Sequence, residues 1–223
     1  MIKLPLRLET IASLVPKGTQ LADLGCDQLL LAQFLIEKEW VKRVIAIDVS
    51  PKVIIKAQSK IKQLDLTSKI DLRCGDGLIP LKVGEVETLV IAGLGHYKII
   101  EILKRDQKQL KGIDNLIIQS NTKVPHIRQY LTTHGFYIEA EKMIKEGSHY
   151  YIVILFKRGK RKYKKHDLIL GPCLRQEKSS TWQQYLAQEK EQQQKLLAVI
   201  PFWYINKRWQ RRRYSRLLSK ELR

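Results

Sequence analysis

Residues 20–28 read QLADLGCDQ, an apolar run that leads into two carboxylates on either side of a glycine. This pattern is typical of the first strand and turn of a nucleotide-binding α/β sheet. A dinucleotide site needs GxGxxG, but this turn contains Gly25 alone, and the chain has no GK[ST] sequence of a P-loop. Because Asp23 and Asp27 would repel a phosphate, the turn favours a ligand that carries positive charge.

Seven apolar, β-rich runs follow one another along the chain, and helical patterns separate the first five. The runs lie at 19–24, 43–48, 69–74, 87–93, 115–120, 136–144 and 150–156, with helical spacing at 29–39, 51–64, 97–110 and 123–133. Alternating strands and helices predict a parallel sheet, and the last two runs leave no room for a helix and predict an antiparallel hairpin. The predicted fold class is therefore α/β: the Rossmann-like sheet of class I methyltransferases, with five parallel strands and an antiparallel terminal hairpin.

An acid stands at the end of each of the first three predicted strands. Asp23, Asp48 and Asp76 would meet at one edge of the sheet, where open α/β sheets bind ligands. Acids there suit the sulfonium, ribose and adenine groups of S-adenosylmethionine. The alternative is that Asp23 and Asp48 are helix N-caps and that Asp76 is a turn acid.

The last third of the chain carries most of the positive charge. The net charge is +19, and residues 157–223 hold 19 Lys/Arg against 5 Asp/Glu. A polyanion partner, with nucleic acid as the leading candidate, is one interpretation, and a solvated helical surface that aids solubility is the other. Helical patterns at 178–200 and 206–222, broken by Pro201, predict a helical hairpin or coiled coil. We therefore expect a cofactor-binding domain at 1–157, followed by a basic linker and helical domain at 158–223.

Composition excludes several other classes of protein. The opening residues lack the uninterrupted apolar stretch of a signal peptide or membrane span. Three isolated cysteines favour a reducing compartment, and the five histidines have no metal-ligand spacing. We expect a cytoplasmic protein, a monomer, with no membrane or metal partner.

The chain resembles the bacterial tRNA (adenine-22-N1)-methyltransferase family, class I methyltransferases with a C-terminal coiled-coil domain. The resemblance rests on RLETIASLVPKGTQLADLGCDQ at 7–28, CGDGL at 74–78, IAGLG at 91–95, IIQSN at 117–121, HYYIV at 149–153 and GPCL at 171–174. It implies methyl transfer from S-adenosylmethionine to N1 of an adenosine in the D-arm of tRNA. By position, it places the cofactor against Asp23, Gly25, Asp27, Asp48, Val49, Asp76, Gly77, Ala92 and Gly93.

Two residues depart from the family pattern. Gln28 stands where the family usually has His, and His96 stands where it usually has a second Gly. His96 is either a substitute for the missing His or a residue that merely starts a helix. These departures keep two alternatives open: a catalytically altered RNA-binding homologue, and a methyltransferase that acts on a protein or a small molecule.

Adenine N1 has an in-plane lone pair, so methyl transfer needs alignment and electrostatics more than a strong base. The candidate catalytic residues are Asp27, which would lie near the exocyclic amine, Asn121 and His96. Tyr97 is either a stacking residue for the flipped base or a core-facing aromatic. The remaining candidates for contact with tRNA are Gln28, Lys123 and a set of arginines on the last predicted helix: Arg208, Arg211, Arg212, Arg213 and Arg216.

Overall fold

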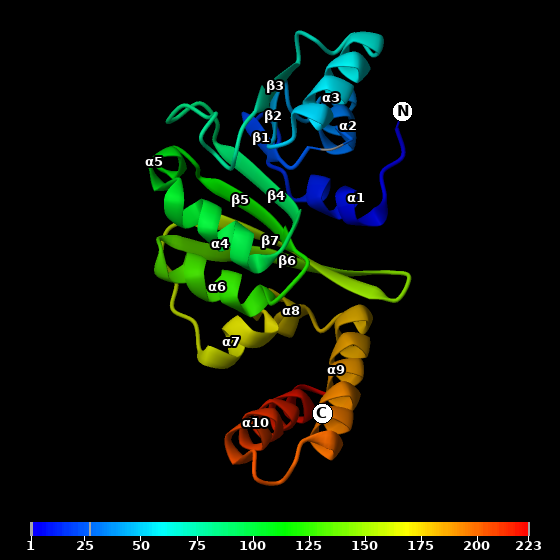
Figure 1. The fold of residues 1–223 in the computed structure, drawn as a ribbon, viewed down its shortest axis with the longest axis vertical. Coiled ribbons are helices and arrows are strands. Elements are labelled where there is room, and N and C mark those ends of the chain that lie inside the picture. Colours follow the sequence, from blue (N-terminus) through cyan, green and yellow to red (C-terminus); the bar gives the residue numbers. More distant parts are fainter. Residues whose placement is uncertain (1, 27, 223) are drawn as a thin grey trace. The chain divides into compact units, whose positions relative to one another are not determined.

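A computed structural model describes residues 2–26 and 28–222 (Figure 1). Its first 162 residues form one compact unit around a seven-stranded sheet with the order β3-β2-β1-β4-β5-β7-β6. The strands are β1 (Leu21–Leu24), β2 (Val44–Asp48), β3 (Ile70–Cys74), β4 (Thr88–Leu94), β5 (Asn115–Ser120), β6 (Phe136–Glu146) and β7 (His149–Arg158).

The first five strands are parallel, and β7 pairs antiparallel with both β5 and β6. Only two residues separate β6 from β7, so these strands form a hairpin at the edge of the sheet. The predicted class I methyltransferase sheet is confirmed. Its central strands are buried along almost their whole length, as expected for parallel strands that helices cover on both faces.

Helices follow the strands at nearly the predicted positions. They are α2 (Leu30–Glu37), α3 (Pro51–Gln63), α4 (His96–Arg105), α5 (Gln107–Leu110) and α6 (Val124–Thr133). The single helix predicted over 97–110 is interrupted at Asp106, whose buried carboxylate accepts a hydrogen bond of 2.8 Å from the backbone N–H of Leu78. An additional helix, α1 (Leu6–Ser13), precedes the sheet and buries Ile11 and Ala12 in the same core as α2 and the first two strands.

One ion pair lies inside the first unit. Arg128 of α6 donates to Glu141 of β6 at 2.6 Å, and both side chains are almost fully buried. A charge pair removed from water in this way fixes α6 against the edge hairpin, because separating the partners would leave a buried charge.

Residues 163–223 form a second compact unit. It contains two short helices, α7 (Lys165–Leu170) and α8 (Pro172–Glu177), and a hairpin of two long helices, α9 (Ser180–Val199) and α10 (Ile205–Glu221). The boundary between the units falls five residues beyond the sequence-based one. The strand β7 runs on to Arg158, and Arg161 pairs with Glu139 of β6 at 3.5 Å, so the start of the basic segment belongs to the sheet unit.

The helical unit is held together by polar contacts as well as by apolar packing. Arg175 of α8 pairs with Asp167 of α7 and, at 2.7 Å, with Glu221 of α10. Arg211 of α10 donates to Gln193 of α9 at 2.8 Å. Several charged side chains that the sequence suggests are exposed to solvent thus form ion pairs or hydrogen bonds within the helical unit.

Candidate active site

The carboxyl ends of the parallel strands meet at one edge of the sheet, and the strand order reverses between β1 and β4. Gly25 follows β1 with φ +87° and donates its N–H to the carbonyl of Ile47 at 2.8 Å. A Cβ on Gly25 would lie 3.8 Å from the carbonyl oxygen of Ala92 on β4. A contact of that length is ordinary, so it is the positive φ of the β1 turn, at the point where α/β sheets bind ligands, that favours glycine here.

Asp23 is buried in β1 beside this turn, only 6% exposed. Burial, followed by repulsion from Asp48, raises its pKa from 3.8 to about 7. An ionised carboxylate there is stabilised when a cation takes the place of the lost water. The edge therefore favours a positively charged ligand.

Asp48 ends β2 and is half-buried, and the next residue, Val49, is exposed. One carboxylate oxygen of Asp48 accepts a hydrogen bond of 2.8 Å from the backbone N–H of Ser50, which precedes α3. This is a capping contact of the kind that the alternative interpretation of Asp48 predicts. It uses one oxygen, so a cap and a ligand contact are compatible on the same side chain.

The loop after β3 carries Asp76 and Gly77. Asp76 pairs with Arg105 at 2.5 Å and with Lys98 at 3.6 Å, and Arg105 in particular lowers the pKa of its carboxyl group. Gly77 has φ +63°, and a Cβ on it would collide with the side chains of Arg105 and Asp106. Only glycine fits this position without a shift of its neighbours.

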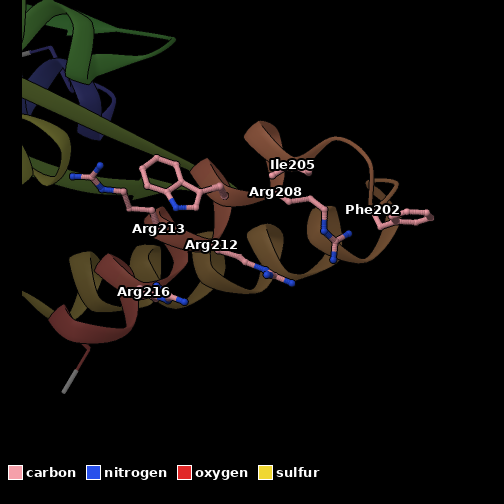
Figure 2. A pocket seen from close by; sticks show the side chains of 7 residues that line it. Phe202, Ile205, Arg208, Arg212, Arg213 and Arg216 are labelled. Carbon is pink, nitrogen blue, oxygen red and sulfur yellow. The ribbon is translucent and has the colours of Figure 1, made fainter.

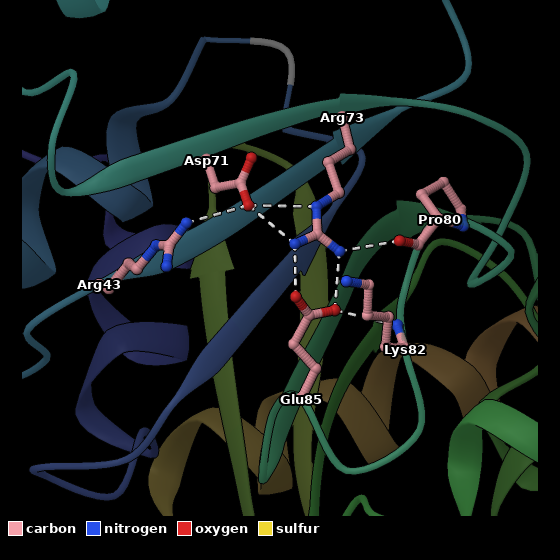
Figure 3. A network of polar contacts seen from close by, with 6 residues as sticks. All are labelled: Arg43, Asp71, Arg73, Pro80, Lys82 and Glu85. Carbon is pink, nitrogen blue, oxygen red and sulfur yellow. Dashed lines mark hydrogen bonds and ion pairs between the residues drawn. The ribbon is translucent and has the colours of Figure 1, made fainter.

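A second ion-pair network connects β3 to the later residues of the same loop (Figure 3). Arg73 of β3 donates to both oxygens of Glu85, at 2.5 and 2.7 Å, and also to Asp71 and to the carbonyl of Pro80. Hydrogen bonding to Arg73 lowers the pKa of Glu85 to about 2. The loop that presents Asp76 and Gly77 is therefore tied to β3 at its base.

The C-terminal end of β4, which leads into the loop before α4, is held by side chains at and just after the end of β5. The backbone N–H of Gly93 donates to Gln119 Oε1 at 3.0 Å, and Gln119 Nε2 donates to Asn121 Oδ1 at 3.0 Å. Asn121 Nδ2 in turn donates to the carbonyl of Gly93 at 2.6 Å. Arg7 of α1 reaches the same group and donates to Gln119 Oε1 at 3.2 Å. Asn121 thus lies at the expected edge, where it also positions the loop.

His96 and Tyr97 begin α4 and point to different surroundings. His96 is buried, its Nδ1 lies 2.7 Å from Thr122 Oγ1, and its Nε2 has no hydrogen-bond partner within the described part of the chain. Burial, followed by the charges of His126 and Lys123, lowers the pKa of His96, which favours the neutral imidazole. Tyr97 is 74% exposed, so the core-facing interpretation of this ring is wrong. Lys123 Nζ lies 5.8 Å from the centre of the Tyr97 ring.

The first loop also carries two of the sequence-based candidates, Asp27 and Gln28. Asp27 lies outside the described residues. Gln28 is exposed, and its backbone carbonyl accepts a hydrogen bond of 2.7 Å from Lys60 Nζ of α3. The side chain of Gln28 is therefore available at the surface of this loop.

The five candidate arginines of α10 differ in their surroundings. Arg208 donates to the carbonyls of Leu197 and Ile200, at 3.1 and 2.5 Å, and so satisfies the C-terminal end of α9. Arg211 is bound to Gln193. The other three are exposed on a groove of the helical unit, which Figure 2 shows: Arg212, Arg213 and Arg216.

A family model described as tRNA (adenine(22)-N(1))-methyltransferase matches residues 21–220. The chain belongs to this family. The Bacillus subtilis tRNA (adenine(22)-N(1))-methyltransferase is 29% identical over 205 residues, which is 89% of this chain and 86% of the relative. The resemblance predicted from the sequence is confirmed.

Solved structures agree with the family assignment. A crystal structure of a Streptococcus pneumoniae protein has a TM-score of 0.95 at 29% identity and covers 99% of this chain and 100% of its own. The same Streptococcus protein has been solved in complex with S-adenosyl-L-methionine. TrmK of M. capricolum, in complex with S-adenosyl-homocysteine, has a TM-score of 0.88 at 28% identity and covers 98% of this chain and 97% of its own.

Two residues of this site have no counterpart among the sequence-based candidates. Arg7 comes from α1, a helix that the sequence did not predict, and Gln119 is a fully buried residue within a strand. Arg7 opens the segment 7–28 and Gln119 lies in the segment 117–121, and the family resemblance of these two segments was the available signal. Within residues 2–26 and 28–222, no helix is long and apolar enough to cross a membrane, and no cluster of His, Cys, Asp and Glu could hold a metal ion.

Proposed function

We propose that this member of the family transfers a methyl group from S-adenosylmethionine to N1 of the adenosine at position 22 of tRNA. The observation that carries the proposal is Asp23, a buried acid of raised pKa at the strand-order reversal of a methyltransferase sheet. Together with the family assignment, this acid favours a cationic cofactor and argues against a phosphate-bearing one.

The residues at this edge fit S-adenosylmethionine in charge and in shape. In the proposed site, Asp23 would balance the positive charges of the sulfonium and ammonium groups, and Gly25 would border the methionine end of the cofactor. The family resemblance assigns Asp27, which lies outside the described residues, to the same end. Arg7, held at Gln119, is the nearby cation that suits the methionine carboxylate. When bound, S-adenosylmethionine supplies the activated methyl group.

The nucleoside end of the cofactor fits the next two strand ends. The second oxygen of Asp48 would accept hydrogen bonds from the ribose hydroxyls, and Val49 would contact the adenosine. Asp76 and Gly77 would border the adenine ring, and the Asp76 carboxylate, which already pairs with Arg105 and Lys98, would accept from its exocyclic amine. The loop of Ala92 and Gly93 separates this pocket from the target base.

On the substrate side, the protein aligns N1 with the methyl group and needs no strong base. Asn121 holds the loop of Gly93 in place and presents its remaining donor and acceptor to the base edge. Tyr97 is free to stack on the flipped adenine, with Lys123 beside it for the flanking backbone. Gln28 is a further candidate for contact with tRNA. His96, neutral and buried, anchors the start of α4 to Thr122 and supports this surface.

The helical unit supplies phosphate contacts in the proposed division of labour between residues 1–157 and 158–223. Arg212, Arg213 and Arg216 are the exposed cations of α10, whereas Arg208 and Arg211 are used within the hairpin. The protein acts as a monomer in the cytoplasm, where its tRNA substrate is made.

The test is incubation with labelled S-adenosylmethionine and unmodified tRNA, followed by nucleoside analysis. We expect N1-methyladenosine at position 22 alone, and we expect loss of product for N121A with cofactor binding retained. Label in a protein or small-molecule acceptor would support another substrate. Cofactor binding without label in any tRNA would show that the chain is a catalytically altered homologue, and either result would overturn the proposal.

A further inference from the structure

The turn that joins α9 to α10 exposes large apolar side chains to solvent. Phe202, Trp203 and Ile205 are 78%, 64% and 72% exposed, and Trp209 on α10 is 59% exposed. The rings of Phe202 and Trp203 contact each other edge to face, with centroids 5.0 Å apart. Soluble proteins rarely leave grouped apolar side chains of this size uncovered unless they bind a partner. We call Phe202, Trp203, Ile205 and Trp209 the aromatic tip.

Three residues of the aromatic tip, Phe202, Ile205 and Trp209, line a groove of about 630 Å³ on α10 (Figure 2). Residues three and four apart share a face of a helix, so the lining side chains fall into two adjacent rows. One row runs Ile205, Trp209, Arg213 and the other runs Arg208, Arg212, Arg216. The guanidinium of Arg213 lies 5.4 Å from the centre of the Trp209 ring.

The apolar side chains of Ile205 and Trp209, beside a row of arginines, match the chemistry of a nucleic-acid strand whose bases are unpaired. Such strands are bound by aromatic rings that stack on bases and by cations that follow the phosphates. The charge supports this partner over a second copy of the chain. Residues 205–221 contain seven Lys/Arg and one Glu, so pairing of two such faces would bring like charges together.

We propose that the aromatic tip stacks on unpaired bases of a tRNA loop, while Arg212 and Arg216 contact the flanking phosphates. This inference rests on the proposed function, because it assumes that the helical unit binds tRNA. It adds a second recognition element, one that distinguishes the looped parts of a tRNA from a plain duplex. Arg208 takes no part, since its guanidinium is bound to the end of α9.

The experiment measures affinity for an unmodified tRNA transcript and for a blunt RNA duplex at several salt concentrations. The variants are F202A/W203A and W209A for the tip, R212Q/R216Q for the basic row, and I55A on α3 as an exposed apolar control (67% exposed) in the other unit. We expect both tip variants to weaken tRNA binding by between about 5- and 150-fold without a change in salt dependence. R212Q/R216Q should instead lower the slope of log K against log salt by about 1 to 2.

The duplex and the oligomeric state separate the possible outcomes. Duplex binding should fall for R212Q/R216Q and stay unchanged for the tip variants and for I55A. Unchanged tRNA binding by the tip variants, or equal weakening on both RNAs, would overturn the stacking proposal. If light scattering showed that the unaltered protein is a dimer and the tip variants are monomers, the aromatic tip would be a protein interface. That result would also overturn the stacking proposal.

Ultraviolet cross-linking of the unaltered protein to tRNA provides a measurement that does not depend on how the variants fold. We expect a cross-linked peptide that contains residues 202–209, and its absence would count against the proposal. If the unaltered protein neither binds nor methylates tRNA, the proposed function itself fails. If it methylates tRNA and the tip variants match it in every assay, only the stacking inference fails.

Discussion

Replacing Asp23 by asparagine should stabilise the ligand-free protein above neutral pH while weakening its binding of the cofactor. The folded state holds this carboxyl group at a pKa of about 7 instead of 3.8, with burial as the main cause and Asp48 as the second. At about 1.4 kcal/mol per pH unit, this difference amounts to about 4 kcal/mol. It is an upper estimate of what the protein loses in stability by keeping an acid in the cofactor site.

The sign follows from where the proton is bound. Between pH 4 and pH 7 the folded state retains the Asp23 proton and the unfolded state does not, so the free energy of unfolding falls as the pH rises. Below about pH 4 both states are protonated and the cost vanishes, whereas above pH 7 it is present in full. D23N cannot ionise, so the stability difference between variant and wild type should grow across this window and then level off.

Urea unfolding of both proteins at pH 4.5, 6 and 8 measures this difference, and groups that titrate alike in both proteins cancel. D48N is the matched control, because it removes only the smaller of the two causes and should give a smaller gain. A D23N difference that is the same at pH 4.5 and pH 8 would refute the assignment of a raised pKa to Asp23. Calorimetry should show weaker S-adenosylmethionine binding by D23N, and wild-type affinity should rise by up to about tenfold per pH unit from pH 5 to 7.

Three further substitutions test the surroundings of the site. G77A should destabilise the protein by about 1–3 kcal/mol more than G147A in thermal unfolding, because both glycines have positive φ but only Gly77 is crowded by side chains; equal effects would show that crowding is unimportant. E141A should cost about 3–5 kcal/mol, whereas E139A on the same strand, at a half-buried ion pair, should cost about 1 kcal/mol or less. Q119A should lower kcat more than it raises KM for tRNA, because it frees the backbone at Gly93 without removing a group that contacts substrate. Q119E keeps the acceptor for Gly93 and should restore part of the lost kcat. If Gln119 had a purely structural role, Q119A would instead lower the amount of folded enzyme without changing kcat.

The sequence was sufficient to predict the sheet and the order of its strands and helices along the chain. Short apolar runs report strands directly, because parallel strands are buried on both faces, and the lack of space between 144 and 150 reports the terminal hairpin. The helix α1 was missed because a short helix with charges at Arg7 and Glu9 has no strong apolar period. The short helices α7 and α8 were not predicted, because each has six residues and buries only one apolar side chain.

The site was predicted less completely than the fold. The acids at the strand ends could be predicted from the sequence, because their position along the chain fixes their position in the sheet. The contact between Arg7 and Gln119 joins segments that are more than one hundred residues apart, and no local sequence pattern indicates such a contact. The arginines of α10 look equivalent in sequence, and only the structure separates Arg208 and Arg211, which stabilise the hairpin, from the exposed ones.

The loop after β4 takes its shape from side chains that belong to β5 and to the residues that follow it. Gly93 is held through its N–H and its carbonyl by Gln119 and Asn121, and the start of α4 is held by Thr122. The four residues GLGH can therefore diverge in evolution while the backbone keeps its path, provided that the amides and the hydroxyl on the neighbouring segment are retained. Across distant relatives, we therefore expect conservation at positions 119–122 as much as in the loop itself.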